Sequence, residues 1–185
     1  KQLVQLTDQY PLSKADISLI STASALHDIG KISISDAILN KPSRLTAEEF
    51  EVIKTHSVIG ANMLLDLSIE QRENPLIKVA SEICRWHHER YDGNGYPDGL
   101  KGEEIPIAAQ VVALADVYDA LISERCYKKA YSHGEALKMI LEGQCGAFNP
   151  TLLLCLQEIA ETLESEFMDT SSEQETKSIQ DIRNE

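Results

Sequence analysis

The chain has 185 residues, of which 43% are hydrophobic and 25% are charged, so its size and composition fit one globular domain with at most a short tail. Its formal net charge of −13 argues against the basic face of a DNA or RNA binder, so we expect no nucleic-acid polymer as partner. No apolar run approaches the roughly 18 residues of a membrane span, so we expect no membrane partner either.

Capping signals predict the starts of three helices in the first half of the chain. They are the pairs Ser13 and Asp16, Thr46 and Glu49, and Asn74 and Pro75. Apolar residues at helical spacing follow each signal, and they predict helices running to about residues 27, 67 and 89.

The second half begins with a break, because residues 91–106 contain four glycines and two prolines. We expect a long ordered loop there, which either is functional or only seals the bundle, followed by a strongly apolar helix over residues 107–123. Ser132 and Glu135 cap another helix that stops near Gly143, and Asn149 with Pro150 opens the last one. These elements predict an all-α helical bundle over residues 1–163 and a polar, acidic tail over residues 164–185.

The cysteines and the first residues indicate the context of the chain. Cys84, Cys126, Cys145 and Cys155 form no C-x-x-C pair, which fits reduced thiols in the cytoplasm. The chain begins with Lys1 and shows no signal peptide, so we expect a fragment of a longer cytoplasmic protein.

Histidines and aspartates recur on helix faces that should point into the bundle. His27, His56, His87 and Asp116 each share a face with apolar residues, and Asp28 follows His27 directly. Burying such groups costs several kcal/mol unless something compensates, and a divalent metal would satisfy all of them together. Imidazole and carboxylate ligands without thiolate favour iron, manganese, nickel or zinc at a catalytic site.

Each of these residues also has a simpler interpretation when it is taken alone. His56 fits a hydrogen-bonded core histidine, Asp116 a buried ion pair with an arginine, and Cys84 a structural thiol. His133, at a helix start, fits an exposed position. His87 and His88 cannot share one helix face, but at a helix end both could reach one metal cluster. The metal hypothesis therefore depends on the whole set.

Two segments resemble the signatures of a known family. LHDIGK at residues 26–31 resembles the His-Asp motif of the HD phosphohydrolase superfamily, and HHERYDGNGYPDGLKGEEIP at residues 87–106 is similar to the second signature of its HD-GYP family. ALADVYDAL and SERCYKKAY continue the pattern, and the similarity covers roughly residues 25–150.

The resemblance implies an HD-type helical bundle and a metal-dependent phosphodiesterase that hydrolyses the bacterial messenger cyclic di-GMP to pGpG or GMP. It implies six metal ligands: His27, Asp28, His56, His87, His88 and Asp116. Asp28 would bridge two metals as a catalytic residue, and Lys31 would contact the scissile phosphate. Arg125 and Lys128 would contact the nucleotide, and Tyr96 could face a guanine. Iron or manganese would be the first choice of metal, with nickel or zinc as alternatives.

The chain departs from the family at two places. No His precedes His27, so the further ligands that the family places upstream are absent, and a third metal is expected only in a longer form of the protein. Cys126 replaces the family's usual Pro, with little expected consequence. The resemblance also implies a two-component signalling context, with a receiver-type regulatory domain at the N-terminal side, and a homodimer is compatible with it.

Two other functions remain open at this stage. One is a metal-poor module that senses the nucleotide without cleaving it, and the missing upstream ligands keep this interpretation open. The other is an HD phosphohydrolase for another nucleotide, against which the glycine-rich segment around Tyr96 argues. Metal-assisted hydrolysis needs no Ser or Cys nucleophile, because water attacks the phosphorus. Lys31 alone would be interpreted as a cation at a helix C-terminus, and Arg125, Lys128 and Lys129 as a solvated cluster.

Overall fold

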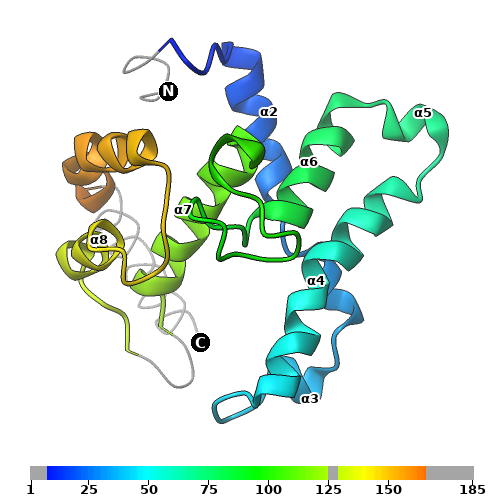
Figure 1. Cartoon of the computed structure of the whole chain (residues 1–185), viewed down its shortest axis with the longest axis horizontal. Coiled ribbons are helices and arrows are strands. Elements are labelled where there is room, and N and C mark those ends of the chain that lie inside the picture. Colours follow the sequence, from blue (N-terminus) through cyan, green and yellow to red (C-terminus); the bar gives the residue numbers. More distant parts are fainter. Residues whose placement is uncertain (1–7, 125–128, 166–185) are drawn as a thin grey trace, which may run out of the picture.

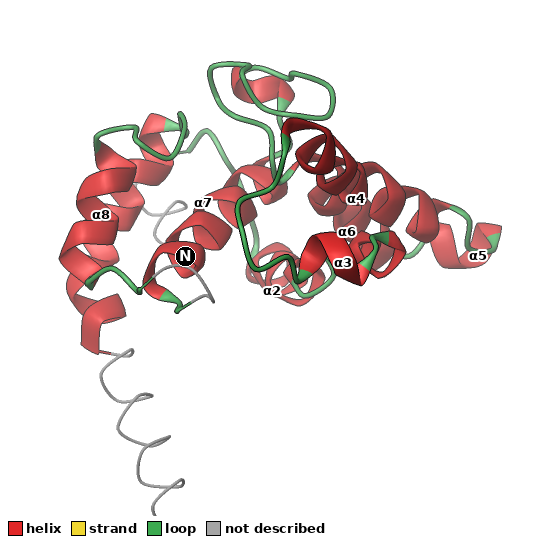
Figure 2. Cartoon of the chain, turned by 90° about the horizontal axis from the view of Figure 1, so that it is seen from below, coloured by secondary structure: helices red, strands yellow, loops and turns green. Residues whose placement is uncertain are grey.

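A computed structural model describes residues 8–124 and 129–165, and within these residues all regular structure is helical (Figures 1 and 2). The all-α prediction is therefore confirmed. The elements in chain order are α2 (Lys14–Ser24), η1 (Ile29–Ser33), α3 (Asp36–Leu39), α4 (Ala47–Leu65), α5 (Ile69–Arg72), α6 (Pro75–Trp86), η2 (Gly102–Glu104), α7 (Ile107–Ile122) and α8 (His133–Leu141). Residues 150–165 are also helical.

The predicted helix starts are confirmed by the hydrogen bonds of their caps. In α2, the Asp16 amide donates to Ser13 Oγ at 3.1 Å, and the Ser13 amide donates to Asp16 Oδ2 at 2.8 Å. The same reciprocal pair opens α4 and α8, and the Asn74 side chain accepts from the first turn of α6. Each pair satisfies backbone groups that a helix end leaves without partners, so the helix begins there.

The predicted helix ends were too late at two places that matter for function. Helix α2 ends at Ser24 rather than near residue 27, so His27 lies in a turn and not on the helical face predicted for it. Helix α6 ends at Trp86 rather than near residue 89, and His87 is its C-cap. The short helices α3 and α5, four residues each, were not predicted.

Helix α7 lies between two groups of helices (Figure 1). On one side α2, α4 and α6 enclose a core that includes Ala61, Ile83 and Cys84, and Val112 of α7 completes it. On the other side Tyr118 of α7 packs with residues of α8 and of the helix 150–165. Because α7 is apolar on two faces, it joins both cores, and this explains its strongly hydrophobic sequence.

The glycine-rich segment of residues 91–106 is irregular except for η2, as predicted, and projects from one end of the bundle (Figure 2). Its first residue is tied to the second half of the chain, because the Tyr91 amide donates to the Ala147 carbonyl at 2.9 Å. A second bond closes the loop on itself, from the Gly102 amide to the Tyr91 carbonyl at 3.0 Å. These bonds fix the loop at the end of α6.

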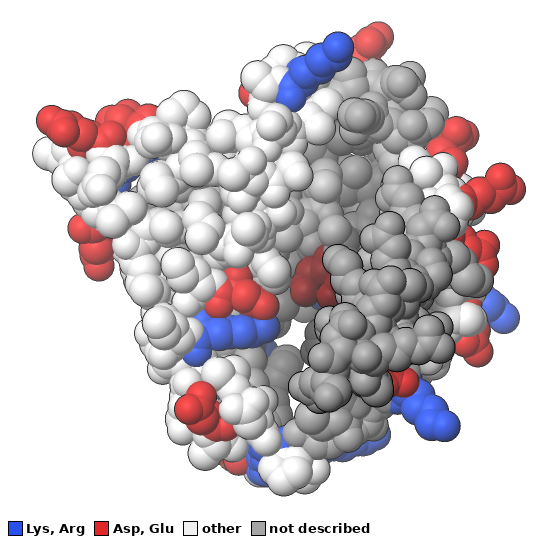
Figure 3. All heavy atoms as spheres, turned by 180° about the vertical axis from the view of Figure 1, so that it is seen from behind, with Lys and Arg blue, Asp and Glu red and all other residues white. Residues whose placement is uncertain are grey.

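The surface of the described residues reflects the acidic composition. Acidic side chains stand out along both edges of the face in Figure 3, and basic side chains lie among them singly or in small groups. Within the described part of the chain, no helix combines the length and the hydrophobicity that crossing a bilayer requires.

Candidate metal centre

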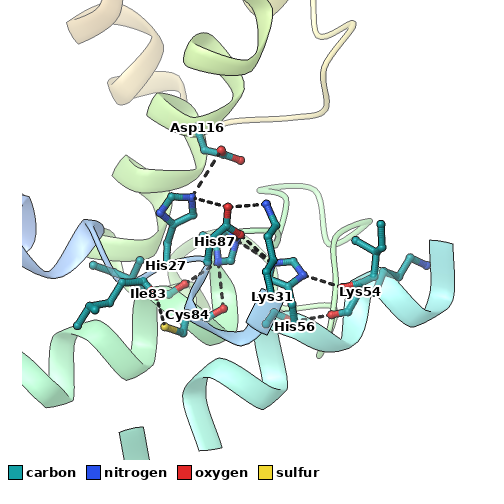
Figure 4. Close-up of polar contacts among 12 residues, drawn as sticks. His27, Lys31, Lys54, His56, Ile83, Cys84, His87 and Asp116 are labelled. Carbon is teal, nitrogen blue, oxygen red and sulfur yellow. Dashed lines mark hydrogen bonds and ion pairs between the residues drawn. The ribbon is translucent and has the colours of Figure 1, made fainter. Parts of the chain in front are cut away.

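The six predicted ligands come from four parts of the chain and meet at one place. His27 and Asp28 lie in the turn between α2 and η1, His56 lies within α4, His87 and His88 end α6, and Asp116 lies within α7. Figure 4 shows His27, His56, His87 and Asp116 pointing toward one another from these separate elements. The structure thus brings together residues that are up to 89 positions apart, from residue 27 to residue 116.

Three of the imidazoles form the innermost group. His56, His87 and His88 each offer a ring nitrogen, and these nitrogens all lie within 4.8 Å of one another. His56 and His87 are 1% exposed, and their Nε2 atoms are 3.3 Å apart. Sets of imidazoles at this spacing are typical of a site for a transition metal.

The outer nitrogens of these rings determine which atoms face the centre. His56 Nδ1 lies 2.6 Å from the Ile53 carbonyl oxygen, and His87 Nδ1 lies 2.9 Å from the Ile83 carbonyl oxygen. A carbonyl oxygen only accepts hydrogen bonds, so Nδ1 carries the proton and each neutral ring turns an Nε2 lone pair inward. Two lone pairs at 3.3 Å repel unless a cation lies between them, and carbonyl-oriented histidines are common at metal sites.

Asp28 supplies a carboxylate to the same centre. Its Oδ2 accepts from Lys31 Nζ at 2.5 Å and lies 3.2 Å from His27 Nε2. Its Oδ1 lies 3.3 Å from His56 Nε2 and is buried without a hydrogen bond. An ionised oxygen without a partner is costly in the interior, so the environment of Oδ1 fits a ligand of a bound cation.

Burial and neighbouring charge keep most of these groups in the protonation state that binds metal. Burial lowers the pKa of His56, and it lowers the pKa of His87 to about 4 and of His88 to about 2. Burial alone would raise the pKa of Asp28, but hydrogen bonds from His27 and Lys31 hold it well below its usual range. The rings are neutral and the carboxylate is ionised, as metal coordination requires.

His27 and Asp116 form the outer side of the centre. The hydrogen bond to Asp28 raises the pKa of His27, because the imidazolium is stabilised next to a carboxylate. Asp116 Oδ1 lies 3.8 Å from His27 Nε2, and both side chains are about a quarter exposed. His27 is thus placed between two carboxylates, and a cation bound here would take the place of its proton.

An apolar cavity of about 440 Å³ opens beside this outer side, between α2 and α7. Ile17, Ile20 and Val112 line its walls, and His27 and Asp116 lie at its edge. The centre is therefore sealed on the side of α4 and α6 and accessible on the side of α2 and α7.

The predicted substrate residues divide into described and undescribed ones. The side chain of Lys31 is 44% exposed and is paired with Asp28. The ring of Tyr96 stacks on His88, with centroids 4.7 Å apart and planes at 27°, and it meets Phe50 edge-on. One face of Tyr96 therefore already has a partner within the protein. Arg125 and Lys128 lie outside the described residues.

Sequence reasoning missed Glu89, which is 2% exposed. Its Oε1 accepts from the backbone amides of Asp98 at 2.7 Å and Gly99 at 3.0 Å, so it holds the glycine-rich loop against the end of α6. Asp98 adds a second attachment through Arg85 and Trp86. A glutamate after two histidines at a helix end gives no sequence signal of burial, because such a position is usually solvated.

The remaining candidates lie outside the centre. The Cys84 thiol donates to the Leu26 carbonyl, and burial raises its pKa to about 12, so it is a structural thiol. His133 is half-buried rather than exposed, and its Nδ1 lies 2.6 Å from the Tyr118 hydroxyl.

Comparison with known proteins agrees with the motifs found in the sequence. The sequence matches the HD domain family over residues 3–152. A probable cyclic di-GMP phosphodiesterase of Vibrio cholerae is 45% identical over 160 residues, which cover 82% of this chain and 35% of that protein. The cyclic di-GMP phosphodiesterase response regulator RpfG of Xanthomonas campestris is 44% identical over 145 residues, covering 78% of this chain and 37% of that protein.

A third relative has a different substrate in its name. The 3'3'-cGAMP-specific phosphodiesterase 2 of Vibrio cholerae is 36% identical over 154 residues, covering 83% of this chain and 28% of that protein. The chain thus spans about a third of the length of the curated relatives it matches.

Proposed function

The chain belongs to the HD domain family, in its HD-GYP branch, and we propose on this basis that it is a metal-dependent phosphodiesterase that hydrolyses cyclic di-GMP to pGpG or GMP. The observation that carries the proposal is the meeting of His27, Asp28, His56, His87, His88 and Asp116 in one centre. Within it the inward lone pairs of His56 and His87 and the unpartnered Asp28 Oδ1 need a cation.

We propose two divalent metals, because the ligands fall into an inner group of three histidines and an outer group around Asp28. Nitrogen and oxygen ligands without thiolate favour iron or manganese, with nickel or zinc as alternatives. Bound there, such cations would supply Lewis-acid stabilisation of the phosphoryl oxygens and lower the pKa of a coordinated water.

The residues of the chain would divide the remaining work among them. Asp28, with one oxygen toward Lys31 and the other toward His56, would bridge the two groups of ligands. Lys31 would exchange its contact with Asp28 for the scissile phosphate and stabilise the charge that develops on it. Arg125 and Lys128 remain predicted nucleotide contacts.

The wider context belongs to the same proposal. Since the chain covers about a third of its relatives, we propose that it works in the cytoplasm, in a two-component signalling protein with a receiver-type domain on its N-terminal side. In that setting residues 1–163 are the HD-GYP domain, residues 164–185 are a tail, and a third metal or a homodimer becomes feasible.

The test combines metal analysis of anaerobically purified protein with hydrolysis of cyclic di-GMP. Asp28→Ala should abolish turnover and reduce the bound metal, while the helical circular dichroism spectrum is unchanged, because only the bridging carboxylate is removed. Asp66→Ala, an exposed carboxylate at the end of α4, is the matched control and should behave as wild type. Full turnover by the Asp28→Ala variant would rule the mechanism out.

A second substrate is favoured by one observation, the similarity to the cGAMP-specific relative. The assay should therefore include 3'3'-cGAMP at the same concentration. The higher identity of 43–46% to cyclic di-GMP phosphodiesterases favours cyclic di-GMP as the better substrate. A metal-free chain that binds either nucleotide without cleaving it would instead be a sensing module.

A further inference from the structure

Arg90 is a cation inside the protein that the proposed mechanism does not use. It follows His87, His88 and Glu89 directly, and its side chain is half-buried. Among the described residues, no carboxylate oxygen lies within 4.0 Å of a guanidinium nitrogen of Arg90, so Arg90 has no ion pair there. A guanidinium that loses water without gaining a carboxylate is costly, so its position calls for a reason.

The protein holds this side chain in one orientation. Nη1 donates to the Glu89 carbonyl oxygen at 3.0 Å, and the guanidinium carbon lies 5.4 Å from the centroid of the Phe148 ring. Gly146 leaves the space for it, because a side-chain carbon there would lie 2.6 Å from Arg90 Nε and 2.7 Å from its Cδ. Contacts of this kind reduce the conformational freedom that an arginine would lose on binding a ligand.

Arg90 lies beside the glycine-rich loop at the metal centre. A side-chain carbon at Gly95 would clash with the Arg90 amide nitrogen, so the loop packs on Arg90 directly before Tyr96. The Tyr96 ring stacks on His88, and His88 precedes Arg90 by two positions. Arg90 is therefore on the His88 and Tyr96 side of the centre, whereas Lys31 pairs with Asp28.

We propose that Arg90 binds a phosphate group of the substrate, and this inference rests on the proposed phosphodiesterase function. The planar fork of a guanidinium matches two oxygens of a phosphodiester, and such charge-assisted bonds are among the strongest in proteins. Metal cations held by the neighbouring ligands would add positive charge around Arg90, and an anion would relieve it. The net charge of −13 supplies no general attraction for an anion, so binding depends on local cations.

The first test compares steady-state kinetics of manganese-loaded variants with cyclic di-GMP. Arg90→Met keeps an unbranched stem against Phe148 but removes the fork, and we expect KM to rise roughly ten- to a hundredfold with unchanged metal content. Arg90→Lys should recover part of this loss, because the charge is kept and the fork is not. Arg72→Met, which removes an exposed arginine in α5, is the matched control and should stay within about twofold of wild type.

Two outcomes of these kinetics would overturn the proposal. One is a folded Arg90→Met variant with normal metal content and a KM within about twofold of wild type. The second applies if Arg90→Met does not fold, because Arg90→Lys then decides in its place. A KM equal to that of the wild type in Arg90→Lys is the outcome that would overturn the proposal.

A second probe separates this inference from the proposed function. Inorganic phosphate is titrated into manganese-loaded protein by calorimetry, and Arg90→Met should weaken its binding about tenfold while Arg72→Met leaves it unchanged. A chain that cleaves no cyclic di-GMP but shows this loss would refute the function and retain Arg90 as a phosphate ligand. Equal phosphate affinity in wild type and Arg90→Met would refute the role of Arg90 alone.

Discussion

At the scale of single residues, Glu89 explains how the glycine-rich loop is held beside the metal ligands. Its buried carboxylate accepts two backbone amides of the loop, and the Tyr96 amide donates to the His88 carbonyl at 3.3 Å. Gly95 allows this fit, because a side chain there would lie 2.5 Å from the Glu89 carbonyl carbon. Glu89 is therefore a positioning residue that keeps the Tyr96 ring on His88.

Replacing Glu89 by Ala should lower the free energy of unfolding by roughly 2–5 kcal/mol, because it removes a buried, charged acceptor of two loop amides. Glu89→Gln keeps an acceptor oxygen and should lose less than half as much. Trp86, the one Trp of the sequence, donates to Asp98 in the same loop, so its fluorescence reports the attachment. Acrylamide should quench Trp86 more in Glu89→Ala than in Glu89→Gln, and equal denaturant stability of both variants would contradict the prediction.

The residues that sequence reasoning found and missed differ in a physical way. Ser13 and Thr46 act within one helical turn, so their partners are visible three residues along the chain. Glu89 accepts from amides nine and ten residues away. Gly146, which accommodates the Arg90 side chain, lies 56 positions after Arg90. Their roles depend on where a long loop folds back, which no local pattern specifies.

At the scale of elements, the close approach of η1 to α4 sets the position of Asp28. A side-chain carbon at Gly30 would lie 2.6 Å from the Gly60 nitrogen and closer still to the His56 carbonyl oxygen. Backbone therefore meets backbone, and this brings Asp28 within 3.3 Å of His56. The glycine of the LHDIGK motif is thus explained by packing next to the ligands.

Gly30→Ala should destabilise the protein by about 3 kcal/mol or more and weaken metal binding at least tenfold, because η1 must move away from α4. Gly60→Ala should have a smaller effect, since its nearest contacts are 3.1 and 3.3 Å. Gly134→Ala in α8, where nothing lies within 4 Å, is the control and should be neutral or stabilising by up to about 1 kcal/mol. Urea unfolding and metal titration measure the series, and equal effects at Gly30 and Gly134 would refute the packing argument.

The helix ends show a further limit of sequence patterns. The apolar period of α2 continues past Ser24, yet the chain turns there. The turn lets Asp28 approach His56 of α4, which a continued helix would carry it away from. Likewise α6 ends at Trp86, which lets His87 and His88 both reach His56. Tertiary contacts around the centre decide these ends, whereas the starts are decided locally.

At the scale of the whole molecule, helix α7 and the metal centre connect the same parts of the structure. Helix α7 contributes Val112 to one core and Tyr118 to the other, and its Asp116 faces His27. A metal bound by Asp116 together with ligands from α4 and α6 would therefore tie α7 to the first group of helices. Since both cores share α7, we expect the described bundle to unfold in one transition.

Metal removal should reveal this coupling in a thermal melt. A ligand at a hundred times its dissociation constant stabilises a folded protein by about 2.7 kcal/mol, which for a chain of this size raises Tm by roughly 5–10 °C. We expect chelator-treated protein to melt in one step, and saturating manganese to move that whole step upward. Asp28→Ala should melt in one step that manganese moves upward less than in the wild type. If two steps appear and manganese moves only one, the metal stabilises the α2, α4 and α6 side alone, and α7 does not transmit its effect to the second core.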